Sequence, residues 1–188
     1  MEKTLEQFDR IMDRCREIFL KKTSDYGTAW RILRQRSLTD QIFIKASRIR
    51  SVEELGVQKV DDPVEQEYMG LVNYGIIALM QLSLPADAPQ ELPYEEAAEG
   101  FDREVAGIRE LLLSKNHDYG EIWRQMRRSS MTDLILMKLL RIKQIEDNEG
   151  KTLISEGLDA NYRDIVNYAI FALILLEEEH AGAEEKGA

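Results

Sequence analysis

Two lysines occupy positions where an amphipathic helix normally carries apolar side chains. Lys45 lies in the middle of an apolar helical stripe, and Lys138 repeats the arrangement 93 residues later. An ammonium group in apolar surroundings must find an anion, lose its proton or reach water, because burying an unpaired charge is costly. Two explanations stay open. Either the lysines form structural ion pairs or reach water from the edge of the stripe, or they face a cavity and bind Asp25, Asp118 or the phosphate of a ligand.

The two lysines belong to an internal duplication of the chain. Residues 8–50 align without a gap on residues 101–143 with 20 identities in 43 positions, and residues 68–82 align on residues 162–176 with 8 identities in 15. Many apolar positions have changed identity, whereas polar ones have been kept, which indicates a polar site in each half. The candidate ligand-binding residues are Lys22, Asp25, Tyr26, Trp30, Lys45, Arg48 and Asn73, with their counterparts Lys115, Asp118, Tyr119, Trp123, Lys138, Arg141 and Asn167.

These residue types suit the recognition of a phosphorylated ligand. We expect the stripe lysines, with Arg48 and Arg141, to contact an anion, because ammonium and guanidinium groups donate charge-assisted hydrogen bonds to phosphate. The Asp-Tyr pairs are expected to contact a sugar, a base or a metal, and the tryptophans to form walls of the site. In the alternative interpretation the same residues cap a helix and cover the end of a bundle. Arg31 and Arg124, which lead into the next helices, could bind phosphate at a helix N-terminus.

Asn73 and Asn167 interrupt the two most apolar helical segments of the chain. A buried amide often fixes helix register, and it could equally orient a ligand. The halves differ nearby, because Asp164 stands where the first half has Gly70, and Glu156 lies shortly before the same helix. Since carboxylates are the ligands that magnesium prefers, Asp164 and Glu156 are candidate metal ligands and magnesium is a candidate cofactor.

The composition narrows the class of partner. The chain has 188 residues, 44% of them hydrophobic, and its 25 Lys and Arg against 35 Asp and Glu give a net charge of −10. Such a surface disfavours binding to duplex nucleic acid or an anionic membrane, but leaves room for a local basic pocket. We therefore expect the protein to bind a small-molecule nucleotide or phosphate ligand, and we expect it to bind neither duplex nucleic acid nor a membrane. A homo-oligomer stays open.

The sequence also indicates a location. The charged beginning of the chain does not read as a signal peptide, and the longest apolar run, residues 168–176, is too short to span a membrane. The single cysteine, Cys15, lies on an apolar stripe, as expected of a buried, reduced thiol. We therefore expect a cytoplasmic protein.

Helices must position all of these residues, because no segment has the pattern of a strand. Each half predicts three helices: an amphipathic first helix, a second that carries the stripe lysine, and a third that is apolar nearly all round. Helices of the last kind pack at the centre of a bundle, so we expect residues 72–82 to pack on residues 166–176. The predicted fold is all-α, a helical bundle of two tandem three-helix repeats with pseudo-twofold symmetry.

The expected organisation places the two repeats in one compact domain. Its parts are a first repeat (1–84), a linker (85–97), a second repeat (98–177) and an acidic flexible tail (178–188). The first helix of each half should end at Gly27 or Gly120, where glycine can adopt the left-handed conformation. The second helix should open at Ser37 or Ser130 with a sequence close to a capping box. The third helix of the first half should begin at the Asp62-Pro63 pair.

The motifs together resemble those of a known family. Each half contains, in order, Lys-x-x-Asp-Tyr-Gly, a tryptophan three residues on, Asp-x-x-x-x-Lys-x-x-Arg-Ile, and Asn-Tyr in an apolar helix. This combination resembles the nucleotide-modification-associated domain, first type, of bacteria and phages, present here as a tandem duplication. The resemblance implies an all-α domain with a role near modified nucleotides and brings no established reaction.

The family is in turn similar to the all-α nucleoside triphosphate pyrophosphatases of the MazG and dimeric dUTPase kind, which bind magnesium through paired acidic motifs. This chain departs from them, because Glu17 and Glu110 lack a second acid at the required spacing. Our leading hypothesis is a protein that binds a nucleotide or nucleotide phosphate. Metal-dependent hydrolysis rests on analogy alone, and whether the chain is an enzyme stays open.

The rival hypothesis is a noncatalytic helical interaction or scaffold module, in which the repeated polar residues hold the bundle together. The environment of the stripe lysines distinguishes the ligand-binding hypothesis from the scaffold hypothesis. Lysines that face a concave pocket favour ligand binding, whereas lysines packed into closed ion pairs favour the scaffold.

Overall fold

The computed structural model describes residues 2–56 and 63–187, and this part of the chain is helical without any strand. The sequence-based expectation of an all-α fold is therefore confirmed. The described residues form six α-helices and two short 3-10 helices: α1 (Glu2–Tyr26), η1 (Ala29–Ile32), α2 (Gln35–Leu55), α3 (Val64–Ser83), α4 (Tyr94–Tyr119), η2 (Ile122–Gln125), α5 (Arg128–Asp147) and α6 (Leu158–Gly187).

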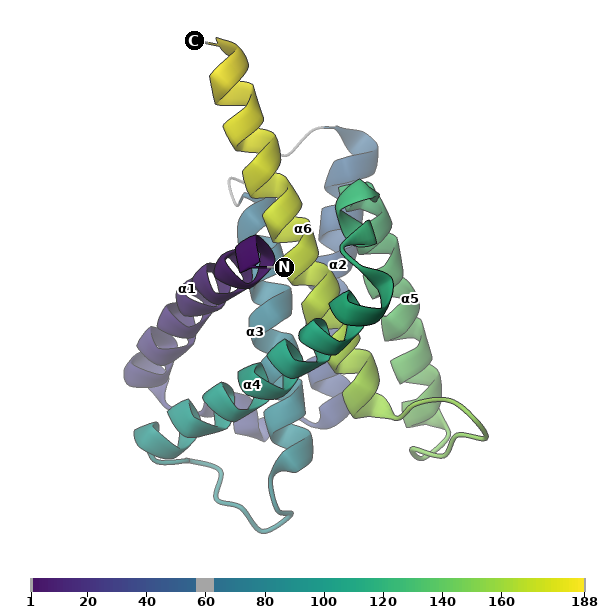
Figure 1. The fold of residues 1–188 in the computed structure, drawn as a ribbon. Coiled ribbons are helices and arrows are strands. Elements are labelled where there is room, and N and C mark those ends of the chain that lie inside the picture. Colours follow the sequence, from purple (N-terminus) through teal and green to yellow (C-terminus); the bar gives the residue numbers. More distant parts are fainter. Residues whose placement is uncertain (1, 57–62, 188) are drawn as a thin grey trace.

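The last helices of the two repeats, α3 and α6, pack side by side at the centre of the bundle (Figure 1). Their approach is close enough that a Cβ added to Gly75 would lie 2.5 Å from Val166 Cγ2. The packing predicted for residues 72–82 and 166–176 is thus confirmed. It follows from their sequences, because a helix that is apolar nearly all round cannot expose a face to water without cost.

The second helices complete a four-helix core around this pair. α2 packs on α3, α5 packs on α6, and α2 and α5 also contact each other. The first helices, α1 and α4, cross this core obliquely (Figure 1), and Phe19 of α1 stacks on Phe101 of α4 with ring centroids 4.7 Å apart. Buried side chains of both repeats form a single hydrophobic cluster.

The ends of the first helices agree with the sequence, but the starts of the second helices do not. Gly27 has a φ of +64° and donates its N–H to the carbonyl of Thr23 at 2.8 Å. α2 and α5 begin earlier than predicted, and neither has a side-chain hydrogen bond from its N-cap residue, Arg34 or Arg127. The predicted capping box is therefore wrong. Ser37 already lies within the first turn of α2. In the Asp62-Pro63 pair, Pro63 is the N-cap of α3, and position 62 lies outside the described residues.

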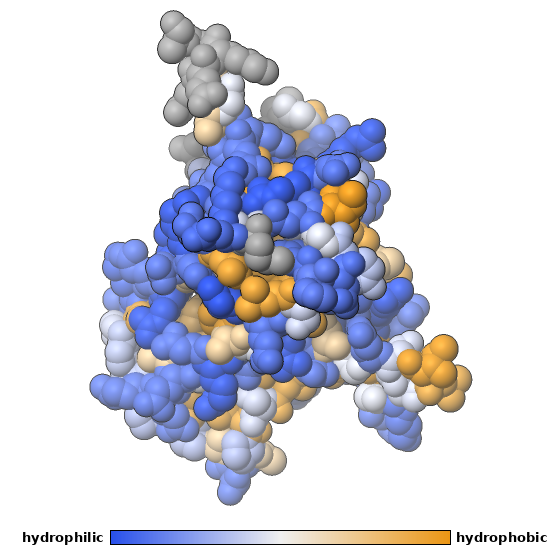
Figure 2. All heavy atoms as spheres, in the orientation of Figure 1, coloured by the Kyte–Doolittle hydropathy of each residue, from blue (hydrophilic) through white to orange (hydrophobic). Residues whose placement is uncertain are grey.

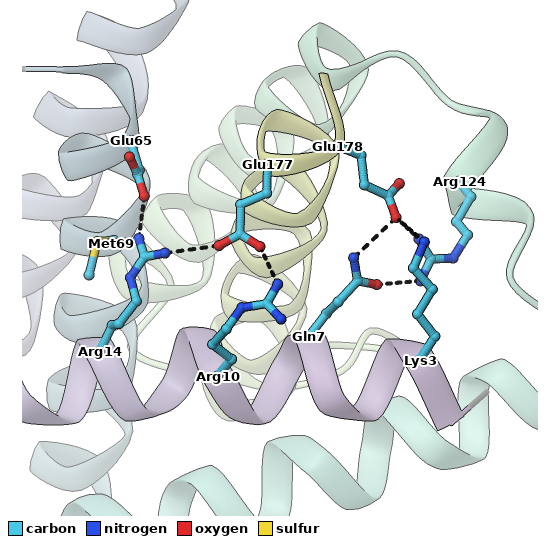
Figure 3. A network of polar contacts seen from close by, with 9 residues as sticks. All are labelled: Lys3, Gln7, Arg10, Arg14, Glu65, Met69, Arg124, Glu177 and Glu178. Atoms are coloured by element: carbon cyan, nitrogen blue, oxygen red, sulfur yellow. Dashed lines mark hydrogen bonds and ion pairs between the residues drawn. The ribbon is translucent and has the colours of Figure 1, made fainter. Parts of the chain in front are cut away.

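The expected acidic tail begins as an ordered part of the bundle. α6 continues as one helix to Gly187, and its glutamates meet cations of α1 and η2 (Figure 3). Glu177 accepts hydrogen bonds from Arg10 at 2.6 Å and Arg14 at 2.9 Å, and Glu178 accepts one from Arg124 at 3.0 Å. The expected flexible tail (178–188) is instead helical as far as Gly187, and Glu177 and Glu178 find counter-charges on α1 and η2.

The segment between the repeats is fastened to η1. The side chain of Thr28 donates to the carbonyl of Gln90 at 3.0 Å and accepts from the N–H of Leu92 at 2.9 Å. Arg31 donates to the carbonyl of Pro89 at 3.2 Å. The repeated arginine at this position therefore has a structural role in the first repeat, and α4 already begins at Tyr94, inside the expected linker.

The surface seen in Figure 2 is mostly hydrophilic, with apolar side chains gathered in small separate patches. Among the described residues, no helix combines the length and the apolar character that crossing a membrane requires.

Candidate ligand-binding site

The stripe lysine of the second repeat lies in a closed ionic cluster. The Nζ of Lys138 lies 2.6 Å from Asp164 Oδ2, and the side chains of Lys138 and Asp164 are only 8% and 7% exposed. The other carboxylate oxygen, Oδ1, accepts a hydrogen bond from Lys115. We call these three residues the ionic triad. Both oxygens of Asp164 are therefore engaged by protein cations.

The first repeat has the same two lysines but a glycine in place of the aspartate. Lys45 instead turns to Glu67, with its Nζ 3.3 Å from Oε2, while Arg48 holds Oε1 of the same carboxylate at 2.5 Å. A Cβ added to Gly70 would lie 2.7 Å from both Cδ and Cε of Lys45. The stem of Lys45 thus lies over Gly70, where the second repeat carries the side chain of Asp164. Lys22, the counterpart of Lys115, is exposed and makes no ion pair with the described residues.

A pocket opens at this point of the first repeat. Its volume is about 950 Å³, within the range usual for small-molecule sites. The walls come from α1, η1, α2 and α3, and they combine aromatic, aliphatic, cationic and amide side chains. The lining residues are Ile18, Phe19, Lys22, Thr23, Tyr26, Gly27, Ala29, Trp30, Ile32, Leu33, Gln41, Lys45, Glu65, Gln66, Glu67, Met69, Gly70, Asn73, Tyr74 and Ile77. We call it the first-repeat pocket.

Two polar groups on the walls of the pocket lack hydrogen-bond partners among the described residues. Asn73 donates its Nδ2 to the carbonyl of Cys15 at 3.1 Å, but its Oδ1 is buried and unpaired, as is the Nε1 of Trp30. Buried polar atoms are nearly always hydrogen-bonded in folded proteins. The Nε1 of Trp123 and the amide of Asn167 in the second repeat are buried and unpaired in the same way, so these atoms are a feature of both repeats rather than of the pocket.

The carboxylates of the pocket already have counter-ions. Glu65 is bound by Arg14, which also reaches Glu177 of α6 at 2.9 Å (Figure 3), and Glu67 is bound by Arg48 and Lys45. The lining therefore contains two lysines and two glutamates, and of these four residues only Lys22 has no ion pair among the described residues.

The other candidate residues of the first repeat differ in whether they line the pocket. Tyr26 is 56% exposed and lines the pocket. Asp25 is exposed and does not line it. The proposed pairing of the stripe lysines with Asp25 and Asp118 is therefore wrong, because their carboxylate partners come from α3 and α6.

The counterparts in the second repeat do not form a comparable pocket. Trp123 is stacked flat on Phe171, with centroids 4.2 Å apart and an interplanar angle of 6°, so this aromatic surface is already covered. Asp118 and Tyr119 are exposed, Tyr119 by 74%. Asn167 is buried, with neither amide atom hydrogen-bonded among the described residues.

The two candidate metal ligands have different surroundings. Glu156 and Arg141 line a second cavity of about 670 Å³ beside the loop between α5 and α6, whereas Asp164 is held by the two lysines of the ionic triad. Among the described residues, no group of three or more His, Cys, Asp or Glu side chains is placed to hold a metal ion.

Some repeated polar residues instead join the repeats to each other. The hydroxyl of Tyr68 lies 2.7 Å from Thr132 Oγ1, and that of Tyr162 lies 2.6 Å from Thr39 Oγ1. Each threonine also donates to a glutamate, Thr39 to Glu146 at 2.7 Å and Thr132 to its counterpart Glu53 at 3.2 Å. These contacts explain why part of the polar set has been retained without any ligand.

Burial shifts the acidity of these groups. It raises the pKa of both tyrosines, Tyr68 and Tyr162, to about 12. It also raises the pKa of Glu53 and Glu146 above the usual value, although nearby hydrogen bonds and arginines partly oppose the shift.

Several pocket residues were not singled out in the sequence, namely Gln41, Glu65, Glu67, Gly70 and Tyr74. The alignment of the two repeats could have indicated Glu67 and Gly70, because the repeats differ at these two positions, which lie one helical turn apart. Glu67 and Gly70 of the first repeat align with Asn161 and Asp164 of the second. The carboxylate that pairs with the stripe lysine thus lies about one helical turn apart in the two repeats, and Lys45, unlike Lys138, lines one of the two described pockets.

Fold and site together define an all-α protein of two tandem repeats, with a pocket of small-molecule size in the first. Comparison with protein families identifies it further. The model described as nucleotide modification associated domain 1 matches residues 22–82 and again residues 115–176, once in each repeat. The chain belongs to this family, as the motifs led us to expect, and it carries the domain as a tandem duplication. No curated protein and no solved structure matches the chain.

Proposed function

We propose that the protein binds a nucleotide, or a closely related phosphorylated ligand, in the first-repeat pocket. The observation that carries this proposal is the difference between the two repeats. The same pair of lysines is closed on Asp164 in the second repeat, but borders a pocket of about 950 Å³ above Gly70 in the first. The name of the family, which refers to nucleotide modification, supports the choice of ligand class.

The chemistry of the pocket suits such a ligand. Trp30, Tyr26 and Tyr74 offer aromatic surfaces on which a base can stack. Lys22 and Lys45 offer ammonium groups for a phosphate. The proposal is confined to binding.

The scaffold hypothesis is favoured for the second repeat. There Lys138 is sealed in the ionic triad and Trp123 is covered by Phe171. We therefore assign ligand binding to the first repeat and structural support to the second. A cytoplasmic location is part of the proposal. Its support is the single cysteine, Cys15, which is fully buried, with the pKa of its thiol raised to about 12 by burial.

The test is a thermal-shift screen against nucleoside mono-, di- and triphosphates, with and without magnesium, followed by titration calorimetry of the hits. Lys45→Met should lower the affinity roughly 10- to 150-fold, as expected for the loss of a charge-assisted contact of about 1.5–3 kcal/mol. The variant should remain folded, because Glu67 keeps Arg48 as its partner.

Lys138→Met is the matched control, since it removes the equivalent lysine from the second repeat and should leave the affinity unchanged. A parent protein that binds no nucleotide refutes the proposal and leaves the scaffold hypothesis for both repeats. Equal losses in the two variants refute the assignment of binding to the first repeat.

A further inference from the structure

We propose that the phosphate of the ligand lies over Gly70, between the ammonium groups of Lys22 and Lys45, and that the ligand is a nucleoside monophosphate. This inference rests on the proposed function and gives the ligand a position and a charge. In the second repeat the carboxylate of Asp164 occupies the equivalent place. Asp164 is thus a built-in substitute for the anion that the first repeat takes from solution.

The ionic triad shows what the two lysine positions can hold. Lys115 and Lys138 approach different oxygens of one carboxylate, so the two side chains converge on a single small anion. Carboxylate and phosphate both accept charge-assisted hydrogen bonds from ammonium groups. Since Lys22 and Lys45 stand at the equivalent positions of the repeat, the same convergence is available to them once an anion is present.

Gly70 provides the room for that anion. With no side chain at this position, the end of Lys45 lies over Gly70, with its Cδ and Cε 2.7 Å and its Nζ 3.0 Å from the place of a Cβ. The end of a lysine side chain is flexible, so an arriving anion can displace it. Any larger residue at position 70 would take this space permanently.

Lys45 can turn to the ligand without leaving a buried carboxylate unpaired. Its contact with Glu67 is 3.3 Å, whereas Arg48 holds the same carboxylate at 2.5 Å. When Lys45 moves, Glu67 keeps its arginine. Of the two partners of Glu67, Arg48 is the closer one and Lys45 the more distant one.

The carboxylates of the pocket limit the charge of the ligand. Glu65 and Glu67 both line the pocket, and Glu67 lies in direct contact with Lys45. A phosphate bound to Lys45 therefore has a carboxylate close by. Each further phosphate of a di- or triphosphate chain would add negative charge near this wall, and like charges at short range repel. A single phosphate matches the two lysines best.

The first measurement uses the parent protein alone. Titration calorimetry should show that nucleoside 5′-monophosphates bind at least about tenfold more tightly than either the unphosphorylated nucleosides or the 5′-triphosphates, with or without magnesium. Tighter binding of a triphosphate, with magnesium present or absent, overturns the assignment of a monophosphate. Equal affinity for nucleoside and monophosphate overturns the phosphate position.

The second measurement installs the internal anion in the first repeat. In Gly70→Asp the new carboxylate should capture Lys22 and Lys45 and lower the affinity for the monophosphate by about 100-fold or more. Gly70→Asn fills the same space without the charge, so it should also weaken binding, but by at least about tenfold less than Gly70→Asp. Equal losses in the two variants would show that the space over Gly70 matters and the charge does not, and they overturn the inference.

The outcomes also separate this inference from the proposed function. If the parent binds nucleotides and Gly70→Asp binds them equally well, the pocket binds nucleotides but the phosphate lies elsewhere. If the parent binds none of the nucleotides, the proposed function fails and this inference fails with it.

Discussion

The ionic triad allows a quantitative test of the fold. In Asp164→Asn the side chain keeps its shape and loses its charge, while both lysines stay in place. Lys115 is 43% exposed and can turn its ammonium group to water. Lys138 is 8% exposed and cannot do so without rearrangement. The substitution should therefore act mainly by leaving the charge of Lys138 buried without a counter-charge.

Removing one partner of a buried ion pair typically costs about 3–5 kcal/mol, and we expect Asp164→Asn to fall in this range. For a chain of this size each kcal/mol corresponds to about 2–4 °C in Tm, so the melting temperature should drop by about 6–20 °C. Lys138→Met should behave differently. It leaves Asp164 paired with Lys115, and the methionine adds apolar volume to an apolar stripe, so the free energy of unfolding should change by no more than about 1 kcal/mol.

Urea denaturation followed by circular dichroism gives both free energies of unfolding, and the double variant Lys138→Met/Asp164→Leu completes the comparison. An apolar pair of similar volume should recover most of the stability lost in Asp164→Asn. The reasoning is refuted if Asp164→Asn stays within about 1 kcal/mol of the parent, because Lys138 would then need no counter-charge. It is also refuted if Lys138→Met is the more damaging of the two substitutions.

Two further predictions concern the clusters that join the repeats. Tyr68→Phe and Tyr162→Phe each remove one buried hydrogen bond to a threonine and should each cost about 1 kcal/mol in the free energy of unfolding. The exposed Tyr119→Phe should cost nothing measurable, and equal effects at all three positions would contradict the role of the clusters. Burial raises the folded-state pKa of Glu146 above its ordinary 4.5, so the folded protein binds this proton more tightly than the unfolded chain does. Stability is therefore lost as the pH rises from about 4.5 through the raised pKa. Glu146→Gln, which cannot ionise, should show a smaller loss than the parent when urea unfolding is compared at pH values across this window, and parallel curves would refute the shift.

The sequence predicts the helices and their central packing well, because both follow from local patterns. The apolar character of residues 72–82 and 166–176 on all sides leaves them no place except the centre of a bundle. The left-handed glycine Gly27 marks the end of α1 through its own conformational freedom. Such features depend on residues close together in the chain.

The partners of the stripe lysines could not be predicted in the same way. Lys115 and Asp164 are 49 residues apart, and periodicity alone does not determine which helix a buried charge will face. The prediction that Asp25 and Asp118 pair with the stripe lysines was therefore wrong. The alignment of the repeats nevertheless showed that Asp164 stands where the first repeat has Gly70. The prediction of an acidic flexible tail missed its ordered start for a related reason. Glu177 and Glu178 look solvated when α6 is considered alone, and they are ordered by cations of α1 and η2.

The hydrogen bonds between tyrosines and threonines bear on the history of the fold. Each one joins a residue of one repeat to a residue of the other, and the two are related by the internal alignment. A single repeat could make the same pair of contacts with a second copy of itself about a twofold axis, as in an isologous homodimer. In such a homodimer every substitution appears twice, so both pockets would be open or both would be closed. Joining the copies in one chain removes that constraint, and it is what permits a glycine in one half and an aspartate in the other.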